Sequence, residues 1–167
     1  MTESSASPIA SELPPALASP TRSSRLLLEG RTPARLAWVG PTATPRLAPM
    51  WFEFTGVELL LSTFSGARKV SDLAVNPDVT ISLDTESFPY RSLRIGGTAT
   101  LEHTDGLTDS YRRCASRYLG PELAARWCDE LGSASQVLIR VRPSWASGSD
   151  MGPGDFLARS DDPSHRG

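Results

Sequence analysis

The chain has 167 residues, of which 39% are hydrophobic, enough to bury one core and to form a single domain. Its formal net charge of −2 gives no general reason to bind nucleic acid or an anionic membrane. No apolar run approaches the roughly 20 residues of a membrane span, and no basic segment precedes an apolar stretch near the first residues. We therefore expect a cytoplasmic protein without nucleic-acid or membrane partners. The two cysteines, Cys114 and Cys128, fit buried helix thiols better than a disulfide framework.

Both ends of the chain have the composition of tails. Residues 1–22 are rich in Ser, Ala and Pro and lack aromatic side chains, so they bury too little surface to offset their ordering entropy. Glycine, proline and polar residues dominate again after about residue 148. We predict a disordered tail at 1–22, one domain at 23–147 and a flexible tail at 148–167.

The elements between the tails have mostly the two-residue period of strands. In chain order, a first helix is expected over 25–30. A hairpin then pairs residues 35–40 with residues 46–54 around the Gly40–Pro45 turn. Short strands with few helices and no regular strand–helix alternation favour a small antiparallel barrel. The further predicted strands are 56–63, 79–83, 93–102 and 137–141, and the further predicted helices are 68–75, 105–119 and 122–131 after Pro121.

The connection between the strand 56–63 and the helix 68–75 has the composition of an anion site. Lys69 is the only lysine among 17 basic residues, and Arg68 precedes it at the start of the helix. Thr63 and Ser65 can donate hydroxyl hydrogen bonds, and the backbone N–H groups of a helix start favour a phosphate. The alternative is an ordinary polar connection with a solvated Arg–Lys pair.

Two further features of the strands need an explanation. Gly96 and Gly97 stand together inside a predicted strand, where they indicate either a bend of the barrel or a close approach to a cofactor. Trp51 and Phe52 are adjacent, so the alternation of a strand places one in the core and the other beside an interface or pocket.

Three motifs carry a family resemblance. They are the Ser65–Lys69 turn with the following Asn76–Pro77, the Pro49–Phe52 strand, and the Arg94–Leu101 strand. In this order they resemble the pyridoxamine 5'-phosphate oxidase-like split-barrel family, whose members bind FMN or the deazaflavin F420. The resemblance covers roughly residues 25–142. It implies a mainly β protein, a six-stranded, antiparallel, Greek-key-like split β-barrel, and a homodimer with the cofactor at its interface.

The resemblance also implies which residues bind the cofactor. One strand would lie along the ring and the strand-to-helix turn would hold the phosphate. Ser92 departs from the pattern, because the vitamin B6 oxidases carry a flavin-contacting glutamine there. The residues matching the cofactor site are Arg46, Pro49, Met50 and Trp51 for the ring, and Thr63, Ser65, Arg68 and Lys69 for the phosphate.

The implied function is that of an oxidoreductase which transfers a hydride between F420 or FMN and a small conjugated substrate. The Pro-Met-Trp-Phe strand and the arginine-rich composition favour F420. The histidines, His103 and His165, form no catalytic or metal-binding arrangement in the sequence, and the catalytic residues stay unknown. Two alternatives remain, an FMN-dependent pyridoxamine phosphate oxidase-like enzyme and a non-enzymatic flavin or haem carrier.

Overall fold

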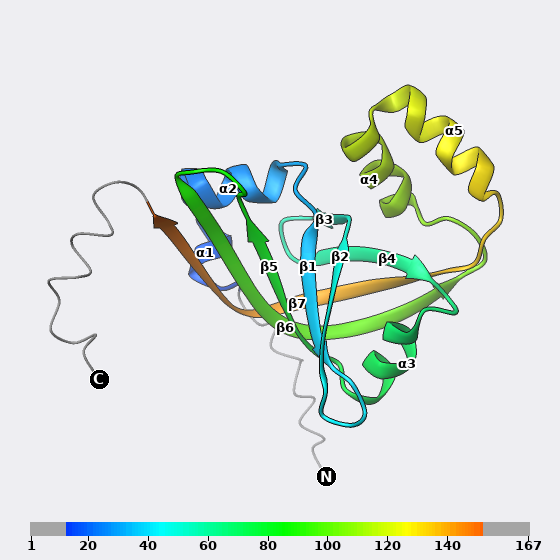
Figure 1. Ribbon diagram of the computed structural model, residues 1–167, viewed down its shortest axis with the longest axis horizontal. Coiled ribbons are helices and arrows are strands. Elements are labelled where there is room, and N and C mark those ends of the chain that lie inside the picture. The colour runs from blue at the N-terminus through cyan, green and yellow to red at the C-terminus, as the bar shows by residue number, and fades with distance from the viewer. Residues whose placement is uncertain (1–12, 152–167) are drawn as a thin grey trace, which may run out of the picture.

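The computed structural model describes residues 13–151, which form a single antiparallel sheet flanked by helices (Figure 1). The chain alternates between strands that build the sheet and short helical segments that cover its ends. The elements are α1 (Pro15–Ala18), α2 (Arg22–Glu29), β1 (Ala34–Val39), β2 (Pro45–Met50), β3 (Phe52–Phe54), β4 (Leu59–Phe64), α3 (Arg68–Val75), β5 (Asp78–Asp84), β6 (Tyr90–Thr104), α4 (Asp109–Leu119), α5 (Pro121–Leu131) and β7 (Gln136–Met151).

The sheet returns on itself through the segment 45–54. Its strand order is β2-β1-β5-β6-β7-β4-β3, so β2 and β3 occupy opposite edges although only Trp51 separates them in sequence. β2 pairs with β1, and β3 pairs with β4. One bent segment therefore belongs to both edges.

This bend is why the structure has seven strands where we expected six. The predicted strand 46–54 is interrupted at Trp51, because its first half follows β1 and its second half follows β4. The predicted pairing of the first hairpin is confirmed, with Trp38 opposite Arg46 and Leu36 opposite Ala48.

The core lies inside the curved sheet. Along β1 and β5 every second side chain is buried, as the two-residue period predicts. Phe52 is completely buried in the same cluster. The members of this core on β1 and β5 are Ala34, Leu36, Trp38, Val79, Ile81 and Leu83.

The predicted tail boundaries need correction. Residues 15–18 form α1 inside the predicted 1–22 tail, because Leu17 inserts into the core and supplies the burial that the composition did not suggest. At the other end β7 continues beside β6 as far as Met151, beyond the predicted boundary at 147. The remaining parts of both predicted tails, 1–12 and 152–167, lie outside the described residues.

Gly96 and Gly97 mark a β-bulge. The register between β6 and β7 shifts between these two residues. A Cβ on Gly96 would lie 2.0 Å from the Trp145 indole, and one on Gly97 would lie 2.1 Å from the carbonyl oxygen of Arg142. The close approach of β7 therefore requires glycine at both positions. Of the two alternatives that the sequence left open, the structure shows the bend of the sheet.

Two other expectations concern single features. Cys114 on α4 and Cys128 on α5 are free and buried, as predicted. Within residues 13–151, no helix has the length and apolar character needed to cross a bilayer.

Candidate functional site

A cavity of about 420 Å³ opens where β2 and β4 part. β3 pairs with β4 from Leu59 to Leu61, but β2 follows β1 instead, so the last three residues of β4 face the end of β2 without a ladder between them. The cavity occupies this gap and is walled on its other side by α4 and α5. Its lining residues are Pro33, Pro49, Met50, Trp51, Ser62, Thr63, Phe64, Lys69, Tyr111, Trp127 and Gln136.

Trp51 forms the flat part of the wall. Its ring stacks on Tyr118 at 5.3 Å between centroids and lies 5.6 Å from the tilted ring of Tyr111. The neighbouring Phe52 points into the core. The expectation that one of this pair is core and the other borders a pocket is therefore confirmed, with Trp51 as the pocket residue.

Lys69 provides the positive charge of the cavity. It lies in the first turn of α3, and its Nζ donates to Thr63 Oγ1 at 3.4 Å. Among residues 13–151 no carboxylate forms an ion pair with it. Burial lowers the pKa of Lys69 from its ordinary value, because no neighbouring anion compensates the desolvation of the ammonium group. An uncompensated, half-buried cation beside a cavity is suited to an anionic ligand.

Arg46 lies away from this cavity. Its Nε is 3.2 Å from Asp72 Oδ2, and the same carboxylate oxygen accepts a hydrogen bond of 2.9 Å from Trp38 Nε1. Asp72 is buried on α3. Arg46 lines a separate cavity of about 540 Å³ with Trp38 and Trp145. Within residues 13–151, the ion pair between Arg46 and Asp72 attaches α3 to the first hairpin.

The other two predicted phosphate residues lie near the cavity without lining it. Ser65 and Arg68 are exposed in the connection that leads into α3. Of the eight predicted site residues, the structure thus brings together in one cavity wall Pro49, Met50, Trp51, Thr63 and Lys69.

The wall opposite Trp51 comes from helices that the sequence did not connect with the site. Tyr111 on α4 and Trp127 on α5 line the cavity, and Trp127 Nε1 donates to the Tyr111 hydroxyl at 2.9 Å. Burial raises the pKa of Tyr111, which keeps its hydroxyl protonated. The aromatic residues at 111 and 127 were a signal in the sequence, but nothing in their spacing shows which strand they would face.

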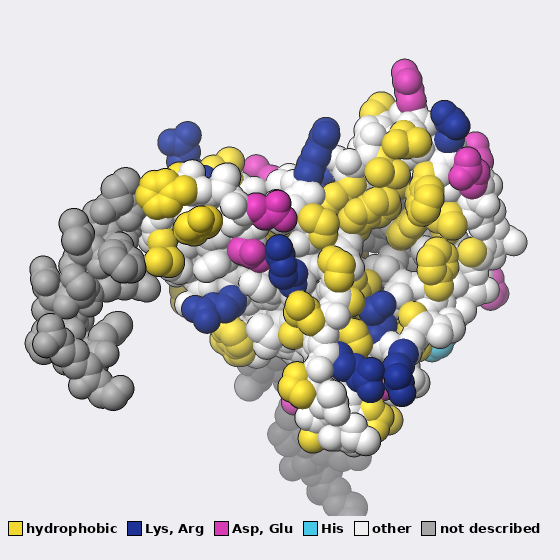
Figure 2. All heavy atoms as spheres, in the orientation of Figure 1, with side chains coloured by type: hydrophobic (Ala, Val, Ile, Leu, Met, Phe, Trp, Pro, Cys, Tyr) yellow, Lys and Arg dark blue, Asp and Glu magenta, His cyan; other side chains and the backbone are white. Residues whose placement is uncertain are grey.

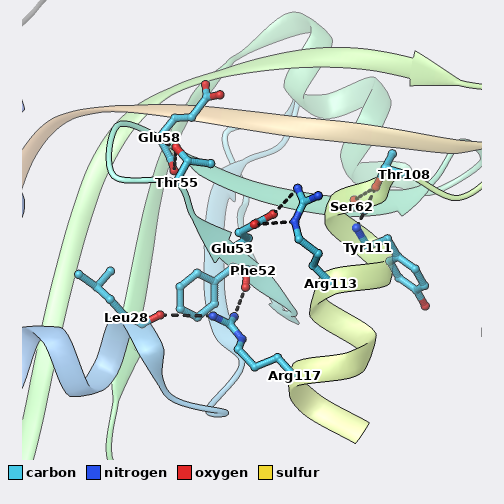
Figure 3. Close-up of polar contacts among 10 residues, drawn as sticks. All are labelled: Leu28, Phe52, Glu53, Thr55, Glu58, Ser62, Thr108, Tyr111, Arg113 and Arg117. Carbon is cyan, nitrogen blue, oxygen red and sulfur yellow. Dashed lines mark hydrogen bonds and ion pairs between the residues drawn. The ribbon is translucent and has the colours of Figure 1, made fainter. Parts of the chain in front are cut away.

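Polar contacts attach α4 to the barrel below this wall (Figure 3). Arg113 donates to both carboxylate oxygens of Glu53, at 2.7 and 2.9 Å, and these hydrogen bonds hold the pKa of Glu53 below its ordinary value. Arg117 donates to the backbone carbonyl of Phe52. These contacts position the helix that carries Tyr111.

Gln136 is another lining residue that the sequence did not predict. It is the first residue of β7 and is 1% exposed. Its Oε1 accepts a hydrogen bond of 3.1 Å from the backbone N–H of Thr108, whereas its Nε2 has no partner. The only signal in the sequence was a polar side chain directly before the apolar run 137–139.

The surface around the cavity is apolar on one side and basic on the other (Figure 2). Hydrophobic side chains gather on the face of α4 and α5 that is turned toward the barrel, and basic side chains gather near α3. Two of the cavity residues are large, exposed hydrophobic side chains, Phe64 at 45% and Trp127 at 39% exposure. Residues 13–151 contain no group of three metal-ligating side chains.

Comparison with known proteins adds the following. A family model described as pyridoxamine 5'-phosphate oxidase matches residues 21–149. Among solved structures, the chain is similar to an F420 reductase, with 30% identity over 72% of this chain and 93% of that chain and a TM-score of 0.61. No curated protein sequence matches the chain.

More distant structures show the same fold. General stress protein 26 from Bacillus anthracis str. Sterne is 18% identical over 80% of this chain and 93% of its own, with a TM-score of 0.56. The haem storage protein HutZ from Vibrio cholerae is 19% identical over 77% of this chain and 93% of its own, also with a TM-score of 0.56.

Proposed function

Because the chain belongs to the pyridoxamine 5'-phosphate oxidase family, we propose that it is an oxidoreductase that transfers a hydride between F420 or FMN and a small conjugated substrate. The observation that carries this proposal is the cavity between β2 and β4, which combines a flat aromatic wall with one uncompensated cation. A flavin or deazaflavin combines the same two features, a flat ring and an anionic phosphate.

The residues present fit such a cofactor. Lys69 would bind the phosphate, and Met50 and Trp51 would support the ring. Tyr111 and Trp127 would close the opposite side and exclude water from the ring. A reduced flavin or deazaflavin, when bound, supplies the hydride, and the protein contributes binding, orientation and exclusion of water. Cofactor contacts of all eight predicted residues remain predictions, and three of these residues, Arg46, Ser65 and Arg68, do not line this cavity.

F420 is our preferred cofactor, and the 30% identity to an F420 reductase supports this preference over FMN. A haem carrier is less well supported, although a haem storage protein shares the fold. His103 is exposed and does not line the cavity, and His165 lies outside the described residues.

We further propose that the protein is a homodimer with one split barrel in each subunit. Phe64 and Trp127 are exposed at the cavity, and a second subunit over them would bury both side chains together with the cofactor ring. Sedimentation of the cofactor-loaded protein at micromolar concentration tests this, and a monomer would contradict it.

Titration of the purified protein with FMN and with F420, followed by fluorescence, tests cofactor binding. The expected result is saturable binding of one cofactor, with F420 bound more tightly. Mixing the loaded, reduced protein with an enone or a quinone then tests hydride transfer through the rate of cofactor reoxidation. If neither cofactor binds, the proposed function is wrong; if one binds without acceleration by any substrate, the protein is a carrier.

A further inference from the structure

Gln136 is held in place from several directions. Its backbone pairs with Phe64 of β4 on one side and with Thr104 of β6 on the other. The Thr104 hydroxyl also donates to its carbonyl oxygen at 3.3 Å. The side chain therefore leaves a backbone that neighbouring strands fix on both sides, in the wall of the cavity that contains Lys69.

The orientation of the Gln136 amide follows from its partner. The backbone N–H of Thr108 is a donor, so the group that faces it at 3.1 Å must be the acceptor Oε1. Turning the amide over would place two donors against each other. Nε2 is consequently the amide group that does not face the Thr108 N–H, and it has two N–H donors to place.

Neither of these donors finds an acceptor in the described chain. Nε2 is buried and has no hydrogen-bond partner, as is also true of Arg46 Nε, Ser110 Oγ and Arg117 Nε in residues 13–151, but of these four residues only Gln136 lines the cavity with Lys69. Leaving a buried donor unsatisfied is costly, and native structures rarely keep one without a reason. The cavity that Gln136 lines supplies such a reason. The Lys69 ammonium in the same wall is also a donor without an anionic partner, so a ligand that carries acceptor oxygens would suit both groups.

We propose that Gln136 is a binding residue of this cavity, whose Nε2 donates a hydrogen bond to an oxygen of the bound flavin or deazaflavin while its Oε1 holds the start of α4. This inference rests on the proposed function and adds to it a residue outside the predicted site. The acceptor is a carbonyl oxygen of the ring or an oxygen of the phosphate.

The same amide links the ligand to the opposite wall. Thr108 is the N-cap of α4, and its Oγ1 accepts from the backbone N–H of Tyr111 at 3.0 Å and lies 2.8 Å from Ser62 Oγ. Figure 3 shows this junction of β4 and α4. A ligand that orders the Gln136 amide therefore also orders the helix that carries Tyr111.

Two variants separate the donor from the structural acceptor. Gln136→Glu keeps Oε1 for Thr108 but replaces the donor with an acceptor, whereas Gln136→Met removes both functions at similar length. We expect both variants to raise the dissociation constant of the cofactor about tenfold, the loss of one hydrogen bond to a ligand. We expect Gln136→Met to lower the unfolding midpoint of the cofactor-free protein at every pH, because the Thr108 N–H loses its acceptor, and Gln136→Glu to lower it only at a pH where the buried carboxylate is charged.

The ligands distinguish the two acceptors. Each variant is titrated with whichever of FMN or F420 the wild type binds, and with riboflavin or the corresponding phosphate-free deazaflavin. An equal loss for both ligands assigns a ring oxygen, and a loss confined to the phosphorylated ligand assigns the phosphate. Unchanged affinity of Gln136→Glu for both ligands would overturn the inference.

A measurement on the unmodified protein tests the contact without comparing the affinities of variants, and a variant serves only to assign one signal. The side-chain amide signal of Gln136 in a ¹⁵N spectrum, assigned by its loss in Gln136→Glu, should shift when cofactor is added. Cofactor binding with an unmoved signal overturns this inference and leaves the proposed function intact. Failure of the wild type to bind either cofactor overturns the proposed function, and this inference with it.

Discussion

Arg46, which contacts helix α3, and Lys69, which belongs to it, differ in what neutralises their charge. Arg46 lies beside the buried carboxylate of Asp72, which also holds Trp38. Lys69 is half-buried, and its one side-chain partner within residues 13–151 is the Thr63 hydroxyl. A charge paired with a buried counter-ion cannot be removed without leaving that counter-ion unpaired, whereas a charge without a protein counter-ion is available to a ligand.

The largest effect is expected from Arg46→Met. It leaves Asp72 buried without its cationic partner, so the free energy of unfolding should fall by about 3 kcal/mol, measured by urea denaturation. The double variant with Asp72→Asn is the control, because it removes the orphaned charge and should recover part of the loss. Unchanged stability of the single variant would show that the ion pair does not anchor α3.

Lys69→Met is expected to lower cofactor affinity without lowering stability, the opposite of Arg46→Met. Losing a charge-assisted contact should weaken cofactor binding by about 1.5–3 kcal/mol, measured by titration at fixed ionic strength. Stability should stay equal or rise, because the variant no longer buries an uncompensated cation. Arg68→Met is the matched control on the same helix start, and its exposed side chain should matter less. Equal losses of cofactor affinity in Lys69→Met and Arg68→Met would show that the half-buried Lys69 contributes no more to binding than the exposed Arg68.

Trp51→Ala tests the flat wall next to the charge. Loss of one stacking partner should weaken cofactor binding by about 1 kcal/mol and shift the absorption spectrum of the bound cofactor. Trp145→Ala removes a tryptophan that lines the separate cavity with Arg46, and it should change neither property. Circular dichroism must first show that both variants fold. A folded Trp51→Ala variant with an unchanged cofactor spectrum would place the ring elsewhere.

The smallest effect is expected from pH. The pKa of Lys69 is lowered, so in the unliganded protein its ammonium begins to lose its proton at a lower pH than an ordinary lysine. Cofactor affinity should therefore decline as the pH rises toward this pKa, and the decline should be absent in Lys69→Met. An identical pH profile for both proteins would assign the dependence to another group.

Local patterns predicted the elements well where side chains interact with close neighbours in sequence. The helix predicted at 68–75 is α3, and the alternation of residues 79–83 is that of β5. A strand period and a helix start are both readable over a few residues, so the sequence also separated Trp51 from the core residue Phe52 and placed Lys69 at the start of α3. Their contacts with a cofactor stay predictions.

The features that the sequence did not predict depend on contacts between residues that are distant in the chain. Arg46 pairs with Asp72, and a basic residue on a strand does not reveal a carboxylate under a later helix. A carboxylate between the buried Val70 and Leu73 was the readable sign that α3 needs a buried cation. Tyr111 lies at the cavity on α4, which Arg113 and Arg117 attach to β3, and no local period encodes these contacts.

Trp51 joins the two edges of the sheet, so closure of the chain and formation of the cavity are the same event. The two sides of the cavity, the end of β2 and the end of β4, face each other only after β2 has paired with β1 and β3 with β4. A ligand that contacts both sides binds only the closed chain and stabilises it by mass action. The gain is about 2.7 kcal/mol at a ligand concentration one hundred times its dissociation constant. The cellular lifetime of the protein would then follow the supply of its cofactor, and a shortage would first be seen as faster degradation.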